Sequence, residues 1–163
     1  MNWLYAAPFV AACLHITEEF FFPGGFAEWD RRYRPEFAGS ITSRLHIIVN
    51  VLLLVVCYDV FATRERSIGP LLWITVAGIE FSNALWHLRG AWKTHSYSPG
   101  MATGTLLYIP MTAYGVTHFV RSGATTPLTA LLGFALGCSY LLIGPLMHRI
   151  RARKTASHGK DAA

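Results

Sequence analysis

Charged residues are scarce in this chain. Only 14% of its 163 residues are Asp, Glu, Lys or Arg, whereas soluble domains carry about 25%. Hydrophobic residues make up 53%, and no segment between the apolar stretches is long enough for a separate soluble domain. The basic residues flank the apolar stretches and do not build a domain of their own, so we expect no nucleic-acid partner.

Cysteines are few as well. The three cysteines, Cys13, Cys57 and Cys138, stand singly in apolar stretches without a CxxC spacing. An odd count without paired spacing predicts no disulfide framework, and we interpret all three as packing residues. No basic segment precedes the first apolar stretch either, so we expect no cleaved signal peptide.

Long apolar stretches dominate what is present. There are five of them: Trp3–Phe22, Ile41–Ala62, Ile68–Gly90, Met101–Arg121 and Pro127–Met147. Each has close to the about 20 residues that cross a bilayer. The sequence therefore predicts an all-α integral membrane bundle of about five transmembrane helices in the cell membrane. Residues 1–150 would form its single domain, and residues 151–163 a basic, disordered cytoplasmic tail.

The positions of Lys and Arg predict the orientation. Most lie in or just after the Phe22–Ser40 connection, near the end of the third stretch and in the tail: Arg31, Arg32, Arg34, Arg44, Arg89, Lys93, Arg149, Arg151, Arg153, Lys154 and Lys160. The opposite side has Arg64, Arg66 and Arg121. Because cytoplasmic loops are rich in Lys and Arg, we expect the N-terminus outside and the C-terminus in the cytoplasm.

The segment HITEE places His15, Glu18 and Glu19 inside the first apolar stretch. On a helix Glu18 lies roughly 60° to one side of His15 and Glu19 about 40° to the other, so all three share a face. An acidic group at bilayer depth costs roughly 2.5–3.5 kcal/mol. Two adjacent carboxylates therefore need a metal ion, a proton or a buried cation beside them.

Other polar residues fall at the same predicted depth. The second stretch supplies His46 and Asn50, the third supplies Glu80, Asn83 and His87, and the following loop supplies His95: together with HITEE they would line one chamber in the inner half of the bundle. Asn50 and Asn83 are expected to support the titratable groups. Interhelical hydrogen bonding alone is the alternative interpretation of such residues.

Two connecting segments adjoin this chamber. Phe22–Ser40 is aromatic and basic, which is typical of an interfacial anchor or of a lid through which a lipid-like substrate enters. Pro99-Gly100 precedes the fourth stretch. A helix that begins there would direct backbone N–H groups toward the chamber and could hold an anion.

At these residues the sequence resembles the HXXEE family of small membrane proteins. HITEE fits the His-x-x-Glu-Glu pattern, and HSYSPGMATG is similar to the family's second signature, which singles out His95, Pro99, Gly100 and Thr103. The resemblance covers about residues 10 to 105 and supports this choice of residues. It implies no reaction.

Three functions fit the chamber. The first is a metal-dependent membrane oxidoreductase or hydrolase with one or two iron, zinc or manganese ions, which acts on a membrane lipid or another hydrophobic molecule. The candidate ligands are His15, Glu18, Glu19, His46, Glu80, His87 and His95, and the candidate catalytic residues are His15, Glu18, Glu19 and Glu80. The second is a metal-free acid–base lipid isomerase. The third is a metal- or proton-binding carrier or subunit.

Gly133 and Gly137 also permit close helix packing and a homo-oligomer.

Overall fold

The computed structural model describes residues 2–143 together with residues 146 and 150. These residues form helices and no strands, which confirms the all-α prediction. In chain order the elements are α1 (Asn2–Phe20), α2 (Phe26–Tyr33), the 3-10 helix η1 (Pro35–Ser40), α3 (Ser43–Ala62), α4 (Gly69–Thr94), α5 (Met101–Thr103), the π-helical turn η2 (Gly104–Tyr108), α6 (Ile109–Arg121) and α7 (Pro127–Cys138). The predicted tail lies outside the described residues.

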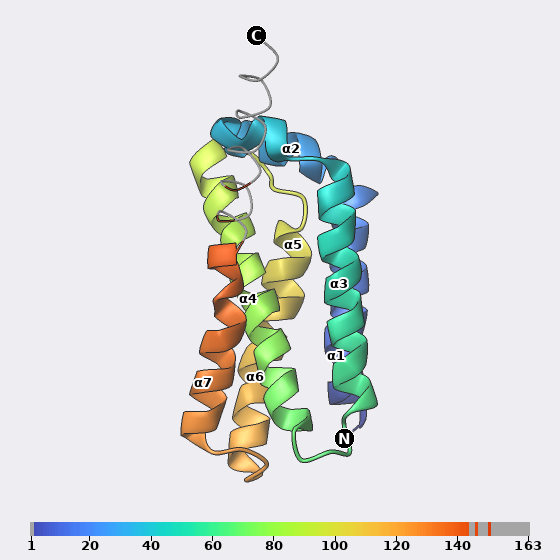
Figure 1. Cartoon of the computed structure of the whole chain (residues 1–163), viewed down its shortest axis with the longest axis vertical. Helices are drawn as coiled ribbons and strands as arrows, with labels where there is room; N and C mark the ends of the chain where they lie inside the picture. The colour runs from blue at the N-terminus through green and yellow to red at the C-terminus, as the bar shows by residue number, and fades with distance from the viewer. Residues whose placement is uncertain (1, 144–145, 147–149, 151–163) are drawn as a thin grey trace.

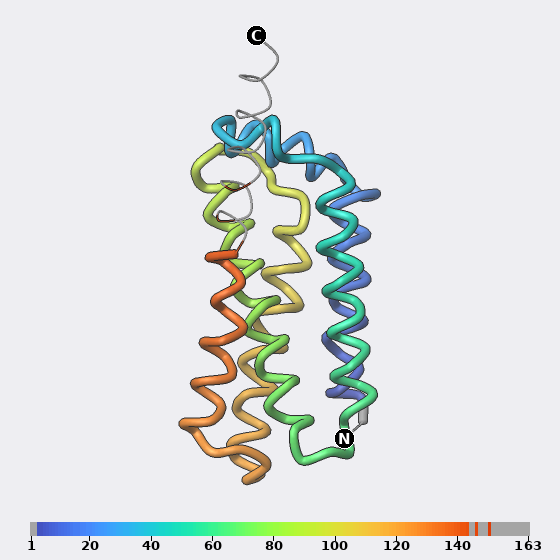
Figure 2. Tube along the Cα trace, in the orientation of Figure 1, coloured from blue at the N-terminus to red at the C-terminus, as the bar shows by residue number. Residues whose placement is uncertain are grey.

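The long helices run along one axis, and α2 lies across one end of the bundle (Figure 1). Helix α1 packs along α3, and α4 packs most extensively along α7 and also contacts α1, α3 and α6. The connection from α4 to α5 turns at the end that α2 covers, whereas the connections α3–α4 and α6–α7 turn at the opposite end (Figure 2). Helix α4 therefore packs against most of the other helices.

Local sequence signals set the helix boundaries. The Thr42 side chain accepts a hydrogen bond from the Leu45 N–H at the start of α3, and Thr126 does the same for Thr129 at the start of α7. Such caps satisfy N–H groups that have no partner inside the helix. Pro127 occupies the first turn of α7, where its missing N–H costs nothing.

Glycines allow α4 and α7 to meet backbone to backbone. A Cβ atom on Gly78 would lie 2.5 Å from the Phe134 carbonyl oxygen, and one on Gly137 would clash with the Thr75 carbonyl. Gly133 packs against the side chain of Leu71, where a Cβ atom would lie 2.6 Å from Leu71 Cδ1. The predicted close packing at Gly133 and Gly137 is thus confirmed, but inside one chain. The homo-oligomer stays a prediction without support from this pair.

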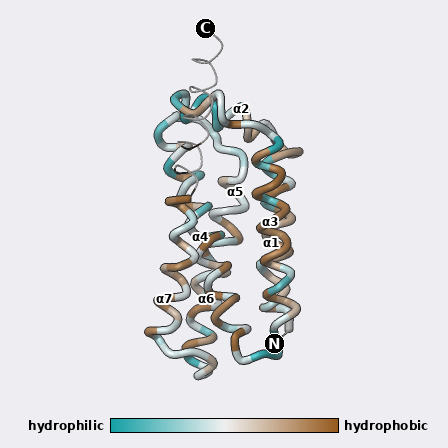
Figure 3. The backbone as a smooth tube through the Cα atoms, in the orientation of Figure 1, coloured by the Kyte–Doolittle hydropathy of each residue, from teal (hydrophilic) through white to brown (hydrophobic). Residues whose placement is uncertain are grey.

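One described helix meets the length and apolarity that a membrane span requires. α3 (Ser43–Ala62) is long and apolar enough to cross a bilayer, with a mean hydropathy of 2.3. The helical segment Pro127–Ile143 is apolar but shorter. Figure 3 shows hydrophobic residues along α3. The other predicted spans are helical in the described residues but do not meet these criteria; α6 and α7, for example, have 13 and 12 residues.

Candidate metal centre

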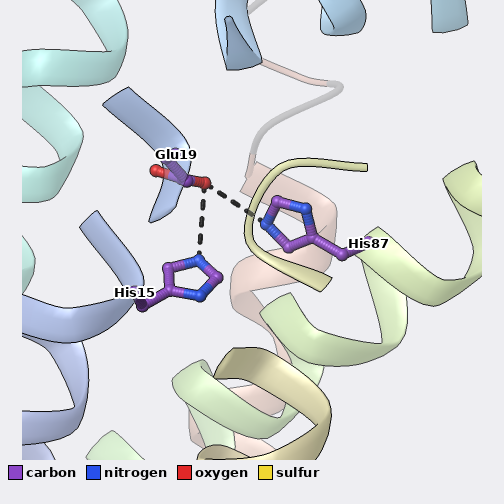
Figure 4. A group of neighbouring side chains, drawn as sticks. All are labelled: His15, Glu19 and His87. Carbon is purple, nitrogen blue, oxygen red and sulfur yellow. Dashed lines mark ion pairs between the residues drawn. The ribbon is translucent and has the colours of Figure 1, made fainter. Parts of the chain in front are cut away.

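Three buried side chains meet in the half of the bundle nearer α2. His15 and Glu19 stand one turn apart on α1, and His87 comes from α4 (Figure 4). Glu19 Oε1 lies 3.4 Å from His15 Nε2 and 3.2 Å from His87 Nε2. The residues are 0%, 2% and 0% exposed, and one ligand atom from each lies within 4.8 Å of the others. Together they form a buried group at metal-ligand spacing, here called the triad.

Neighbouring polar groups hold each member of the triad. His15 Nδ1 is 2.9 Å from the Thr103 hydroxyl, and His87 Nδ1 is 2.8 Å from the Ser98 hydroxyl. Asn50 donates its side-chain N–H to the second oxygen of Glu19 at 2.9 Å. Each imidazole is therefore bound through Nδ1, and its Nε2 points at Glu19.

The hydrogen bonds fix the tautomer of His15. The single hydroxyl hydrogen of Thr103 is directed at Glu18 Oε2, which is 2.6 Å away, so His15 Nδ1 must donate to Thr103. In a neutral ring Nε2 then carries a lone pair, and it faces the Glu19 oxygen at 3.4 Å. Two lone pairs repel at this distance, and a proton or a cation between them would remove the repulsion.

Asn83 is another polar residue beside His15. Its amide nitrogen lies 3.3 Å from His15 Nε2. His87 Nε2 has no hydrogen bond among the described residues, although it is within ion-pair distance of Glu19. The predicted meeting of α1, α3 and α4 through His15, Glu19, Asn50, Asn83 and His87 is thus observed.

The charge of the Glu18 carboxylate is compensated by hydrogen bonds from the loop before α5 and from the start of that helix. Its Oε1 accepts the backbone N–H groups of Gly100 (2.8 Å) and Ala102 (3.1 Å) and the Tyr97 hydroxyl, and its Oε2 accepts both the N–H (2.7 Å) and the hydroxyl of Thr103. These groups form the N-terminus of the helix that begins with α5. The sequence predicts an anion site there, and the anion is the chain's own carboxylate. Burial and the bond to Glu18 raise the pKa of Tyr97 to about 12.

Gly100 closes the loop over the triad. Its φ of +100° suits glycine, and a Cβ atom on it would lie 2.7 Å from Cε1 of both His15 and His87. The aromatic rings of α2 cover another side, because the ring centroids of Phe26 and Trp29 lie 5.2 and 6.3 Å from that of His87. α2 therefore covers one side of the site.

Glu80 lies outside the triad. It is fully buried, and the Cys57 thiol is 3.7 Å from its Oε1. Its Oε2 and the Tyr108 hydroxyl have no hydrogen-bond partner among the described residues. Glu80 is thus buried as predicted, but next to a thiol and apart from the two histidines.

His46 and His95 also lie apart from the triad. His46 Nε2 is 3.2 Å from Asp30 Oδ2, while Arg34 makes a two-point contact with the same carboxylate at 2.8 and 2.6 Å. Burial alone would raise the pKa of Asp30, but the bonds from His46 and Arg34 outweigh burial and lower it. His95 is exposed and ends α4 with a positive φ.

Sequence reasoning missed several supporting residues. Asp30 and Arg34 stand four apart on α2, a spacing that could have signalled an ion pair. Ser98 offers no signal of this kind, because its contact with His87 depends on the path of the loop.

The arrangement can now be compared with known proteins. Residues 6–115 match the family described as "Protein of unknown function with HXXEE motif". The chain belongs to this family. The HXXEE motif supplies two members of the triad, His15 and Glu19, while its first glutamate, Glu18, anchors the loop. The matched residues include His87 and leave α7 outside. No curated protein and no solved structure matches the chain.

Proposed function

We propose that this HXXEE protein is a metal-dependent membrane enzyme whose single divalent cation is held by His15, Glu19 and His87. The spacing of the triad carries the proposal. Ligand atoms about 2.0–2.1 Å from a tetrahedral cation lie about 3.3–3.4 Å from one another. The distances from Glu19 Oε1 to the two Nε2 atoms are 3.4 and 3.2 Å. A cation placed among these atoms would also remove the repulsion between the lone pairs.

The surrounding hydrogen bonds support the same proposal. Histidines that bind metals almost always donate their other ring N–H to a nearby group. His15 meets Thr103 in this way, and Ser98 stands at the corresponding position beside His87. Asn50 holds the oxygen of Glu19 that faces away from the histidines. The triad is thus oriented by its neighbours before any ion binds.

One metal ion fits better than two. The two oxygens of Glu18 already accept hydrogen bonds from the loop, and Glu80 and His46 have other neighbours. Two histidines and one carboxylate suit iron, zinc or manganese. Such a cation would act as a Lewis acid in hydrolysis or as a redox centre in oxidation.

The chain's own residues would orient and shield the reaction. Asn50 and the loop hydroxyls fix the ligands, and the burial of the triad excludes bulk water. The substrate is proposed to be hydrophobic or amphiphilic, because the aromatic rings of Phe26 and Trp29 cover the site.

The outward faces of the bundle favour a multi-pass membrane location. Large apolar residues are exposed along α3 and α7: Ile47, Ile48, Val51, Leu52, Val55, Leu128, Leu131, Leu132 and Leu136. Soluble monomers rarely expose apolar patches beyond a few hundred Å². A lipid environment accounts for these faces and for the span α3.

Metal analysis of the detergent-solubilised protein tests the proposal. We expect about one iron, zinc or manganese ion per chain, lost in Glu19→Gln and retained in His95→Gln. Both variants keep a side chain of similar size, and only Glu19 belongs to the triad. Metal-free protein that remains folded, or equal metal content in both variants, contradicts the proposal.

A metal-free acid–base enzyme is the second candidate. It is favoured by one observation: the same Glu19 oxygen faces both imidazoles, as it would if a proton moved among them. In that case added zinc or iron leaves the unfolding temperature unchanged. A bound metal stabilises the folded state and raises that temperature.

A further inference from the structure

A cavity lies directly beside the triad and has no role in the proposed metal site. Its volume is about 110 Å³, and α1, α2, α3, α4 and the residues that continue α7 border it. Glu19 and Asn50 line one part of it, and Asp30 and His46 line another. Leu45, Val49 and Leu141 are among its apolar residues. The cavity therefore joins a polar region to hydrocarbon walls at the proposed centre.

His46 lines this cavity and has one polar atom without a partner among the described residues. The residue is only 9% exposed, and its Nδ1 has no hydrogen-bond partner among the described residues. Its other nitrogen, Nε2, faces the Asp30 carboxylate at 3.2 Å and therefore carries the hydrogen. Nδ1 of the neutral ring is then an acceptor. A buried acceptor without a partner costs free energy unless a ligand supplies a donor.

The charges around His46 favour a neutral ligand. Arg34 is bound to Asp30 at two points, so this ion pair leaves little net charge at the cavity. A hydroxyl group can donate to His46 Nδ1 without bringing a charge.

His46 is also close to the triad. The Phe26 ring centroid is 4.8 Å from that of His46 and 5.2 Å from that of His87. On α3, Asn50 follows His46 by one turn and holds Glu19. A molecule bound to His46 would thus lie beside the proposed reaction centre.

We infer that this cavity binds the substrate and that the substrate is a neutral amphiphile with a hydroxyl group. The hydroxyl donates to His46 Nδ1, and the hydrocarbon chain packs against Leu45, Val49 and Leu141. Asp30 is a positioning residue that fixes the ring of His46. This inference rests on the proposed enzyme function, because it names the substrate class of that site.

Photolabelling of the full chain in detergent tests the inference. The probe is a long-chain alcohol with a diazirine close to the hydroxyl, and labelled peptides are identified by mass spectrometry. Unlabelled dodecanol and its methyl ether serve as competitors. We expect labelling near Leu45–Val49 or Tyr140–Ile143, and competition by dodecanol at a concentration at least about tenfold lower than by the ether, which cannot donate.

Variants locate the binding site. Val49→Trp fills the cavity and should abolish labelling, whereas Val55→Trp on the exposed face of α3 should not. His46→Phe should remove the preference for the alcohol over the ether. Equal competition by alcohol and ether with the unmodified chain, or labelling that persists in Val49→Trp, overturns the inference.

The outcomes separate this inference from the proposed function. Metal content is measured on the same preparations. Bound metal together with equal competition by the two compounds refutes the alcohol site and leaves the metal centre intact. Absence of metal together with a clear preference for the alcohol refutes the metal centre and retains the binding cavity.

Discussion

The carboxylate of Glu18 receives both the backbone N–H and the hydroxyl of Thr103, at 2.7 and 2.6 Å. This contact joins the end of α1 to the start of the helix formed by α5, η2 and α6. It also directs the Thr103 hydroxyl away from His15, which fixes the donor role of His15 Nδ1. The two adjacent glutamates therefore have separate tasks, because Glu18 anchors the loop while Glu19 faces the histidines.

Replacement of Glu18 should weaken this anchor. Glu18→Gln places an amide N–H against backbone N–H groups, and we expect a loss of about 1–3 kcal/mol in the free energy of unfolding. Glu28→Gln is the matched control, since Glu28 is exposed and forms a surface ion pair with Arg31; it should cost less than about 1 kcal/mol. Denaturant unfolding followed by circular dichroism measures both. Equal losses in the two variants would disprove the anchoring role.

Gly100 should be essential for the geometry of the triad. Gly100→Ala combines a strained φ with a Cβ atom 2.7 Å from both imidazoles, so we expect metal affinity to fall by at least about tenfold. Gly123→Ala has the same kind of strain, with φ of +73° and open space around its Cβ atom. Metal titration of the two variants separates strain from displacement of the histidines. A Gly100→Ala protein with unchanged affinity would show that the loop does not position the ligands.

Asp30 should make stability depend on acid pH. Its pKa is lowered in the folded state, so its ion pair contributes fully above the unfolded pKa of about 4 and is lost as the pH falls through the folded value. Asp30→Asn removes the buried charge that faces Arg34 and His46 and should cost about 3 kcal/mol at neutral pH. Denaturant unfolding between pH 3 and 7 should show this difference shrink below about pH 4. A difference that stays constant over the whole range would exclude the ion pair as its cause.

The glycines between α4 and α7 should stabilise the single chain. Gly137→Ala introduces a Cβ atom that clashes with the Thr75 carbonyl, and we expect a loss of about 1–3 kcal/mol from overpacking. Gly39→Ala, where a Cβ atom meets nothing within 4 Å, is the control. Light scattering in detergent should give the same molecular mass for both variants. A change of mass in Gly137→Ala alone would assign this glycine to a contact between chains.

Much of the triad could be predicted from the sequence. Helical periodicity places His15 and Glu19 on one face, and the predicted depth of the third apolar stretch brings His87 to the same level. Periodicity could not separate Glu18 from Glu19, because both angles from His15 are small. The separation depends on where the loop before α5 runs, and the sequence indicates only that a helix begins near Gly100.

The remaining polar contacts depend on tertiary packing. Asp30 belongs to α2, whose placement over the bundle end cannot be derived from helix periodicity. Its contact with His46 therefore removes a predicted ligand from the triad. Glu80 shares a helical face with His87, but their spacing of seven residues is about 10.5 Å along the axis. The predicted chamber is thus divided into the triad, the Asp30–His46 pair and the Glu80–Cys57 contact.

X-ray absorption spectroscopy of the metal-loaded protein tests the triad most directly. With zinc bound, we expect two imidazole nitrogens and a carboxylate oxygen at about 2.0–2.1 Å, without a sulfur ligand. His87→Gln should reduce the imidazole contribution by one ring, whereas His46→Gln should leave it unchanged. A sulfur ligand, a second metal nearby, or an unchanged spectrum in His87→Gln would contradict a centre formed by His15, Glu19 and His87.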